Sequence, residues 1–212
     1  MLKGSDRIFA NQLYNFVFKM AKTIFKDCNK LLTNYEKNAT EGKWEFSEFA
    51  NEWRAMRFEL IFSGRQHLAE LPNFCRSLFH IAKKFIFHPS SGQTKRMGAL
   101  FLCYGLYEKQ PLKMKMKIRL TLDELKILWS LVQSETNLDP LFIFCKMFVE
   151  NAFHFCATSR DFTQLRLKPA ESKQVAPQPM NSIPESQLIE FVEQINSWNL
   201  PQLNQFENLL FQ

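Results

Sequence analysis

Four basic side chains lie close together in one short stretch of the sequence. Lys113, Lys115, Lys117 and Arg119 follow Pro111, with no acidic residue among them. Cations on an exposed connector are the side chains that contact phosphate oxygens, and such contacts position a protein on nucleic acid without reading its sequence. We therefore interpret this stretch as a candidate anion-binding edge, with its four cations as candidates for phosphate contact.

A second basic group surrounds the stretch HPSSGQTKR at residues 88–96. Its members are Lys83, Lys84, Lys95 and Arg96. Each has a structural alternative: Lys83 and Lys84 could form the solvated face of a helix, and Lys95 and Arg96 could flank a helix end. We keep all four as further candidates for phosphate contact.

Other chemistry finds little support in the sequence. The spacing closest to a metal motif is His154-x-Cys156, but a zinc site needs four converging ligands and no second pair is present. His154 lies within AFHFCA, which favours a hydrogen-bonded core histidine. The five cysteines are odd in number and widely spaced, a pattern typical of reduced, buried thiols. No GxGxxG or GxxxxGK[ST] motif occurs, and we predict no cofactor, no metal and no catalytic residue.

Composition and charge divide the chain into a basic body and an acidic tail. All 27 Lys and Arg residues, but only 17 of the 21 acids, fall within residues 1–173, so the remainder carries four acids and no base. A basic body favours a polyanionic partner. No apolar run approaches a membrane span, and the N-terminus lacks the features of a signal peptide. We expect a soluble, intracellular chain without a membrane partner.

The elements that must position these side chains are helices. Apolar residues recur at steps of three and four almost throughout, and period-two alternation is scarce, so we predict an all-α fold, a helical bundle or short solenoid. Thr121 and Glu124 have the form of a capping box, and Asp139 before Pro140 looks like a helix cap. The expected helices span residues 6–36, 45–62, 66–87, 93–108, 121–135, 139–157, 184–197 and 201–211.

Residues 97–107 should form a fully buried helix, because nearly every residue there is apolar or aromatic. Gly98 and Gly105 are seven positions apart and share a stripe where another helix backbone could approach closely. The aromatic residues of the chain recur at core-facing helical spacing, so we interpret them as packing residues and not as base-stacking platforms, which lie exposed in grooves.

The chain divides into three parts. We predict a helical scaffold domain over residues 1–160, a linker over 161–183 that is rich in proline from 167 on, and a C-terminal helical segment over 184–212. Short helices are marginal alone in water, so this segment must pack on the body or on a partner, and both remain open. The candidates for partner binding are Leu188, Val192, Trp198, Phe206 and Leu210.

Three ordered signatures within residues 46–157 resemble the snRNA-activating protein complex subunit 1 family. The first is FSEFANEWRAMRFELIFSGR at 46–65, the second is RMGALFLCYGLY at 96–107 followed by Lys-Ile-Arg at 117–119, and the third joins Ile143-Phe144 to the AFHF of 152–155. The positions that we expect to be structural or to face partners are Phe46, Phe49, Trp53, Arg54, Met56, Arg65, Gly98, Tyr104, Gly105, Tyr107, Phe153 and His154.

The resemblance implies a nuclear role in transcription. The family contributes an architectural subunit to the factor that recognises the proximal sequence element of small nuclear RNA genes, which serves RNA polymerases II and III and cooperates with the TATA-binding protein. Its implied partners are the large Myb-repeat subunit and subunit 3, to which base reading is mainly attributed. For this chain the resemblance implies a non-catalytic scaffold with auxiliary DNA phosphate contacts.

Two alternatives remain at this stage. A helical adaptor could bind acidic lipid or another polyanion through the same basic edge, and a helical enzyme would need converging polar groups that the sequence does not show. Arg54 and Arg65 match the family pattern, but half-buried arginines more often pair with a carboxylate such as Glu52, Glu59 or Glu70.

Overall fold

A computed structural model describes residues 4–39, 43–64, 68–133 and 138–158, with side chains of the first helix from residue 19 onward. The predicted linker and the C-terminal segment 184–212, with its partner-binding candidates, lie outside the described residues. The elements in chain order are α1 (Gly4–Asn38), α2 (Phe46–Ala55), η1 (Phe58–Phe62), η2 (Leu68–Glu70), α3 (Leu71–Phe87), α4 (Gln93–Lys109), β1 (Ile118–Leu120), α5 (Leu122–Val132), α6 (Leu138–Val149) and β2 (Phe153–Phe155).

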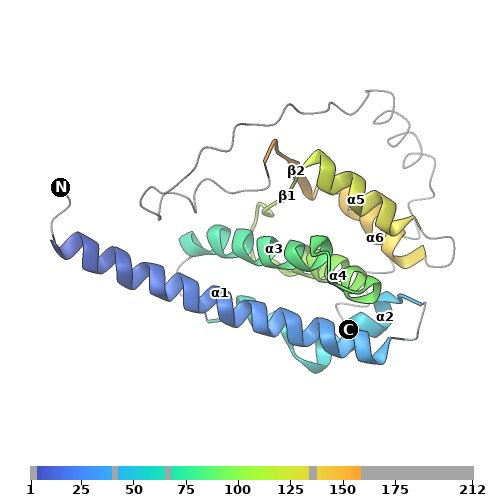
Figure 1. Ribbon diagram of the computed structural model, residues 1–212, viewed down its shortest axis with the longest axis horizontal. Helices are drawn as coiled ribbons and strands as arrows, with labels where there is room; N and C mark the ends of the chain where they lie inside the picture. Colours follow the sequence, from blue (N-terminus) through green and yellow to red (C-terminus); the bar gives the residue numbers. More distant parts are fainter. Residues whose placement is uncertain (1–3, 40–42, 65–67, 134–137, 159–212) are drawn as a thin grey trace.

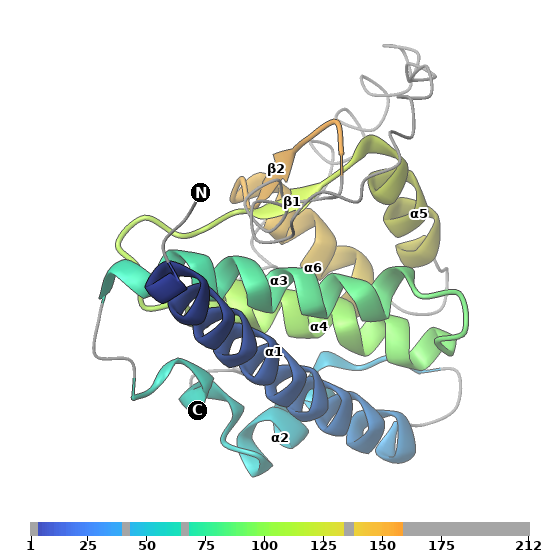
Figure 2. The ribbon, with the colours of Figure 1, turned by 60° about the vertical axis from the view of Figure 1, so that its left-hand side comes forward.

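The helices form three layers around an antiparallel pair, α3 and α4. Helix α1 crosses one face of this pair, and α5 and α6 cover the opposite face (Figure 1). Helix α2 packs against the C-terminal half of α1, beside α4 (Figure 2). The prediction of an all-α fold is confirmed, and no described helix is long and apolar enough to cross a membrane.

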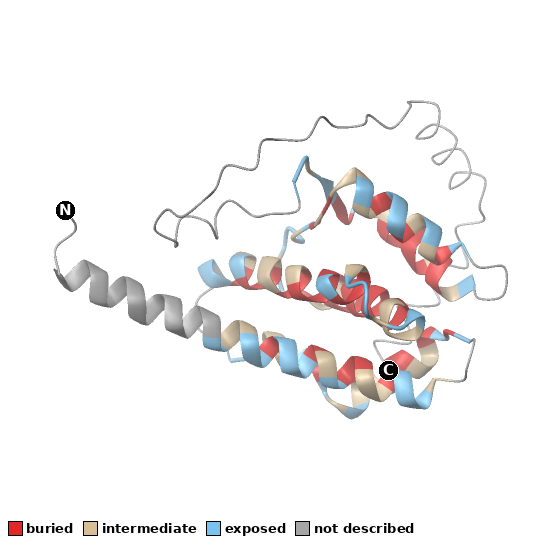
Figure 3. Cartoon of the chain, in the orientation of Figure 1, coloured by how far each residue is buried: buried red, intermediate tan, exposed pale blue. Residues whose placement is uncertain are grey.

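Helix α4 is the central element, as its composition predicted. Every residue from Met97 to Tyr107 is buried, which colours most of this helix red in Figure 3. Its neighbours on several sides are α1, α2, α3 and α6, so no face of the helix is left for charged side chains.

The two glycines of α4 do admit close neighbours, but the neighbours are aromatic rings from two different helices. A Cβ atom at Gly98 would lie 2.7 Å from a ring carbon of Tyr35 on α1, and one at Gly105 would lie 3.0 Å from the indole of Trp53 on α2. The expected approach of a single helix backbone is therefore wrong in detail. The missing side chains make room for rings that fix α1 and α2 on α4.

An aromatic cluster joins α1, α2 and α4. The Phe46 ring packs edge-on against Phe101 and Tyr104, with centroids 5.4 and 5.5 Å away, and Phe49 lies 5.8 Å from Tyr35. These side chains are fully buried, so they bury large apolar areas and gain from edge-to-face geometry. Their burial supports the interpretation of the aromatic pattern as core packing.

One predicted cap is confirmed and the other is wrong. Thr121 and Glu124 form a reciprocal capping box at the start of α5. Asp139 lies inside the first turn of α6 and instead accepts a hydrogen bond from the backbone N–H of Phe46, at 2.8 Å. Since the N-terminus of a helix leaves N–H groups unsatisfied, this carboxylate caps α2 from a distant part of the chain.

A two-stranded parallel sheet replaces the end of the expected helix 139–157. Helix α6 ends at Val149, Asn151 adopts a left-handed φ of 57°, and the chain continues as β2, which pairs with β1 in the register Ile118↔Phe153. His154 is exposed on β2, so the prediction of a core histidine is wrong. Successive side chains of a strand point to opposite faces, which turns His154 away from the buried Phe153.

The expected helix 45–62 is also divided. Helix α2 ends at Ala55, Arg57 takes a left-handed φ of 48°, and a short 3₁₀ helix follows. The change of direction packs Phe58 against Trp53, with ring centroids 4.9 Å apart.

Candidate nucleic-acid interface

The connector between α4 and β1 carries the predicted basic run. Gln110, which is buried, holds it in shape: its amide nitrogen donates to the carbonyls of Tyr107 and Met116, and its amide oxygen accepts from the N–H of Met116 at 2.7 Å. A buried side chain that satisfies three backbone groups fixes a loop without secondary structure. The connector is therefore a defined surface on which its cations are held.

The cations of the connector differ in availability. Lys113 and Lys117 are exposed and make no ion pair within the described part of the chain. Lys115 lies 2.8 Å from the Glu108 carboxylate and 4.7 Å from the centre of the Tyr107 ring. Arg119 is half-buried on β1. Lys113 and Lys117 are thus the two side chains best placed to meet a phosphate.

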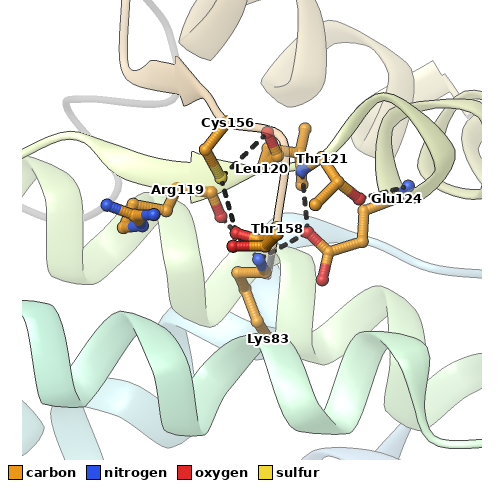
Figure 4. A network of polar contacts seen from close by, with 7 residues as sticks. All are labelled: Lys83, Arg119, Leu120, Thr121, Glu124, Cys156 and Thr158. Carbon is orange, nitrogen blue, oxygen red and sulfur yellow. Dashed lines mark hydrogen bonds and ion pairs between the residues drawn. The ribbon is translucent and has the colours of Figure 1, made fainter. Parts of the chain in front are cut away.

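Lys83 must be removed from the candidates. It is buried, and its ammonium donates to the backbone carbonyl of Arg119 and to Glu124 Oε2, at 2.6 Å from the carboxylate (Figure 4). The same carboxylate oxygen accepts from the N–H of Thr121 at 2.9 Å. Lys83 therefore joins α3, β1 and α5, and the alternative of a solvated helix face is equally wrong for it.

Two other members of the second basic group, Lys84 and Lys95, line a groove of about 780 Å³ at the loop between α3 and α4. Lys84 is exposed on its edge, and the Lys95 ammonium lies 2.8 Å from Asn29 Oδ1. Arg96 donates through Nε to the carbonyl of Ile86 at 2.7 Å, so part of its guanidinium closes the turn between the two helices. Lys84 and Lys95 line the groove and remain candidates for phosphate contact.

The two basic regions lie at opposite ends of α4. The connector begins after Lys109, and the groove opens where α4 starts at Gln93. A helix of 17 residues is about 25 Å long, so one phosphate cannot touch both regions, whereas an extended polyanion can.

The signature positions are mainly structural. Phe46, Phe49, Trp53, Tyr104, Tyr107 and Phe153 are buried, and Gly98 and Gly105 pack against rings as described above. Arg54 pairs with Asn51 Oδ1 at 2.7 Å and not with the expected carboxylates, and Met56 Sδ accepts from Asn34. His154 is exposed, and Arg65 lies outside the described residues.

A cluster of carboxylates near the connector was missed by the sequence analysis. Glu108 lies in the last turn of α4 and meets Glu150, which follows α6, where the buried Lys146 lies 3.2 Å from the Glu150 carboxylate. Burial, and next the charge of Glu108, raise the pKa of Glu150. The pair could not be foreseen because these acids are 42 positions apart and carry no motif.

The described cysteines have the character of buried thiols. Cys28, Cys103 and Cys145 are buried, and loss of solvation raises the pKa of each thiol to about 12. Cys156 is partly exposed. Among the described residues, no group of three or more His, Cys, Asp or Glu side chains is arranged to hold a metal ion.

Comparison with known proteins gives one consistent result. The family described as "Small nuclear RNA activating complex (SNAPc), subunit 1" matches residues 24–209 of the chain. A human protein named snRNA-activating protein complex subunit 1 is 35% identical over 135 residues, which cover 62% of this chain and 35% of the relative. The mouse protein of the same name is 34% identical over 115 residues, or 53% of this chain and 29% of the relative. The chain thus matches about a third of these relatives' length.

Proposed function

Since the chain belongs to the family of subunit 1 of the small nuclear RNA activating complex, we propose that it is a non-catalytic scaffold subunit of a nuclear complex for transcription of small nuclear RNA genes by RNA polymerases II and III. Its proposed partners are a Myb-repeat subunit and subunit 3, with the TATA-binding protein as a further contact. The observation that carries this proposal is the family match, which spans the whole described core beyond residue 24.

The packing of the chain agrees with a scaffold. Most of the family signature residues pack helices against one another: Trp53 of α2 fills the space over Gly105 of α4, and Phe46 of α2 packs against Tyr104 of α4. A rigid three-layer body offers fixed surfaces to partners, while the apolar residues of 184–212 are the proposed partner-binding element.

The proposed contact with DNA is to phosphate, through Lys113 and Lys117. Both are exposed on a connector that Gln110 holds in shape, and neither is engaged with a described acid. Phosphate contacts position a complex on promoter DNA, and the proposed base reading belongs to the partner subunits.

The test is the salt dependence of DNA binding by the assembled complex. Each lost phosphate contact reduces the magnitude of the negative slope of log K, the DNA-binding constant, against log salt concentration by about 0.9. The double change Lys113→Glu with Lys117→Glu should therefore reduce this magnitude by about 1.8 for specific and non-specific DNA alike. Lys126→Glu, at an exposed lysine on α5, is the matched control and should leave the slope unchanged. An unaltered slope with the complex still assembled would refute the proposed phosphate contact.

A further inference from the structure

The groove beside the α3–α4 loop has an aromatic floor that water reaches. Phe25 of α1 is 43% exposed and stacks on Phe85 of α3, with ring centroids 4.8 Å apart. Phe87 and Pro89 continue the lining toward the loop, which Figure 2 shows joining the two central helices. Phe85 itself is buried, so the accessible aromatic surface of the groove is that of Phe25 and the partly exposed Phe87, and an exposed aromatic side chain inside a groove is a place where another segment can pack.

Two cations flank this floor. Lys84 is exposed, and the Lys95 ammonium lies 5.8 Å from the centre of the Phe85 ring while it contacts Asn29. Two acids also line the groove: Glu124 is paired to Lys83, and Glu36 lies at the loop end against Gly92. The surface around Phe85 is therefore apolar with a positive rim.

The sequence contains a segment of complementary character at its acidic end. Within the predicted helix 201–211, Leu203, Phe206 and Leu210 recur at steps of three and four and share a face with Glu207, which follows Leu203 by four. A carboxylate within an apolar stripe loses its hydration when that stripe is covered, so it requires a cation on the surface that covers it.

The chain leaves the described body close to the groove. The N–H of Cys156 donates to the carbonyl of Leu120, and Figure 4 shows Thr158 in the same cluster as Lys83 and Glu124, both of which line the groove. The 25 residues 159–183 that follow would span about 27 Å as a flexible chain, and the predicted helix 184–197 would add about 21 Å. The tether therefore reaches the groove without strain and keeps the segment at high local concentration.

We propose that residues 201–211 dock as a helix in this groove of their own chain, with the apolar stripe on Phe25 and Phe87 and with Glu207 paired to Lys84 or Lys95. The docked state belongs to the chain before assembly: it covers part of the proposed partner-binding segment until a partner displaces it. Docking of residues 201–211 does not depend on promoter binding, so its test is independent of the function proposed above.

Zero-length carbodiimide cross-linking of the full chain tests the contact directly, because it joins a carboxylate to an amine only when the two touch. We expect a product between Glu207 and Lys84 or Lys95 whose yield does not change on dilution, and which Glu207→Gln abolishes while Glu190→Gln does not. Products only with Lys113 or other lysines outside the groove, products only between two copies of the chain, or no product at Glu207 would overturn the proposal.

Hydrogen exchange on charge-reversed chains provides the second measurement. Glu207→Lys should speed amide exchange of residues 201–211 by more than about fivefold, the upper end for loss of one solvent-exposed ion pair, because the docked carboxylate is partly desolvated, and should also raise exchange around residues 80–95. Adding Lys84→Glu and Lys95→Glu should restore protection to both segments. Lys84→Arg with Lys95→Arg retains the charges and should retain protection while it removes the cross-link. Loss of protection in 201–211 alone, or no rescue by the reversed pair, would contradict docking in this groove.

Discussion

Breaking the buried ion pair between Lys83 and Glu124 should destabilise the fold more than any single change of an exposed charge. The Lys83 side chain is 8% exposed and that of Glu124 is 15% exposed, and their charged atoms lie 2.6 Å apart. Removing one partner of a buried pair commonly costs 3–5 kcal/mol, since the other charge is left without compensation. Because Glu124 retains some solvent and its bond to Thr121, we expect about 3 kcal/mol for Lys83→Met.

The reverse change isolates the electrostatic part. Glu124→Gln preserves an amide oxygen that can accept from the N–H of Thr121 and from Lys83, so the capping of α5 survives, but the Lys83 ammonium loses the negative charge that compensates it. We again expect a loss of about 3 kcal/mol, and about the same loss for the double variant, because either single change already removes the pair. The coupling free energy between the two positions should therefore be about 2–3 kcal/mol.

Urea unfolding followed by far-ultraviolet circular dichroism measures these values by linear extrapolation. Lys126→Met, at an exposed lysine of α5, is the matched control and should change the free energy of unfolding by less than about 0.5 kcal/mol. If the losses at Lys83 and Glu124 added to within about 0.5 kcal/mol, the two side chains would be uncoupled, and the inferred clamp between α3, β1 and α5 would be wrong.

Two further changes test the packing of the core and the long-range cap. Gly98→Ala should destabilise the chain by at least about 1 kcal/mol more than Gly105→Ala does, because the added Cβ would lie 2.7 Å from the Tyr35 ring at Gly98 but 3.0 Å from the Trp53 ring at Gly105. Urea unfolding of the two variants side by side measures the difference, and equal losses of stability would contradict the described packing. Asp139→Ala should lose about 1 kcal/mol with the cap on Phe46, whereas Asp139→Asn retains the acceptor. Burial, the largest cause, raises the pKa of Asp139 above 3.8, so folding favours its protonated form. Wild-type stability should therefore improve relative to Asp139→Asn as the pH falls through the raised pKa toward 3.8, and a pH series in which the difference moves the other way would refute this assignment.

Much of the fold could be predicted because it depends on local pattern. The all-round apolar composition of residues 97–107 indicated a buried helix, and the capping box of Thr121 and Glu124 marked the start of α5. Both signals act within one or two turns of helix. The positions of the glycines also predicted close packing, since a missing side chain leaves space wherever the helix is buried.

The remainder depends on contacts between distant residues. Lys83 meets Glu124 from 41 positions away, and Asp139 caps Phe46 from 93 positions away, so no local pattern announces either. The strand at Phe153–Phe155 follows α6 after only three residues, and its short apolar run fits a helix end equally well until its pairing with β1 is known. The groove also depends on a contact between distant residues. Phe25 lies beside the main apolar stripe of α1, and its role in the groove can be recognised only from its stacking on Phe85.

Reconstitution with the proposed partner subunits tests the central claim most directly. The chain, a Myb-repeat subunit and subunit 3 are co-expressed, and the mass of the assembly is measured by size-exclusion chromatography with light scattering. The scaffold role predicts one equimolar complex that fails to form when this chain is omitted or when Leu188, Val192 and Trp198 are changed together to Asp. A stable complex of the two partners that forms without this chain and does not bind it would contradict the account.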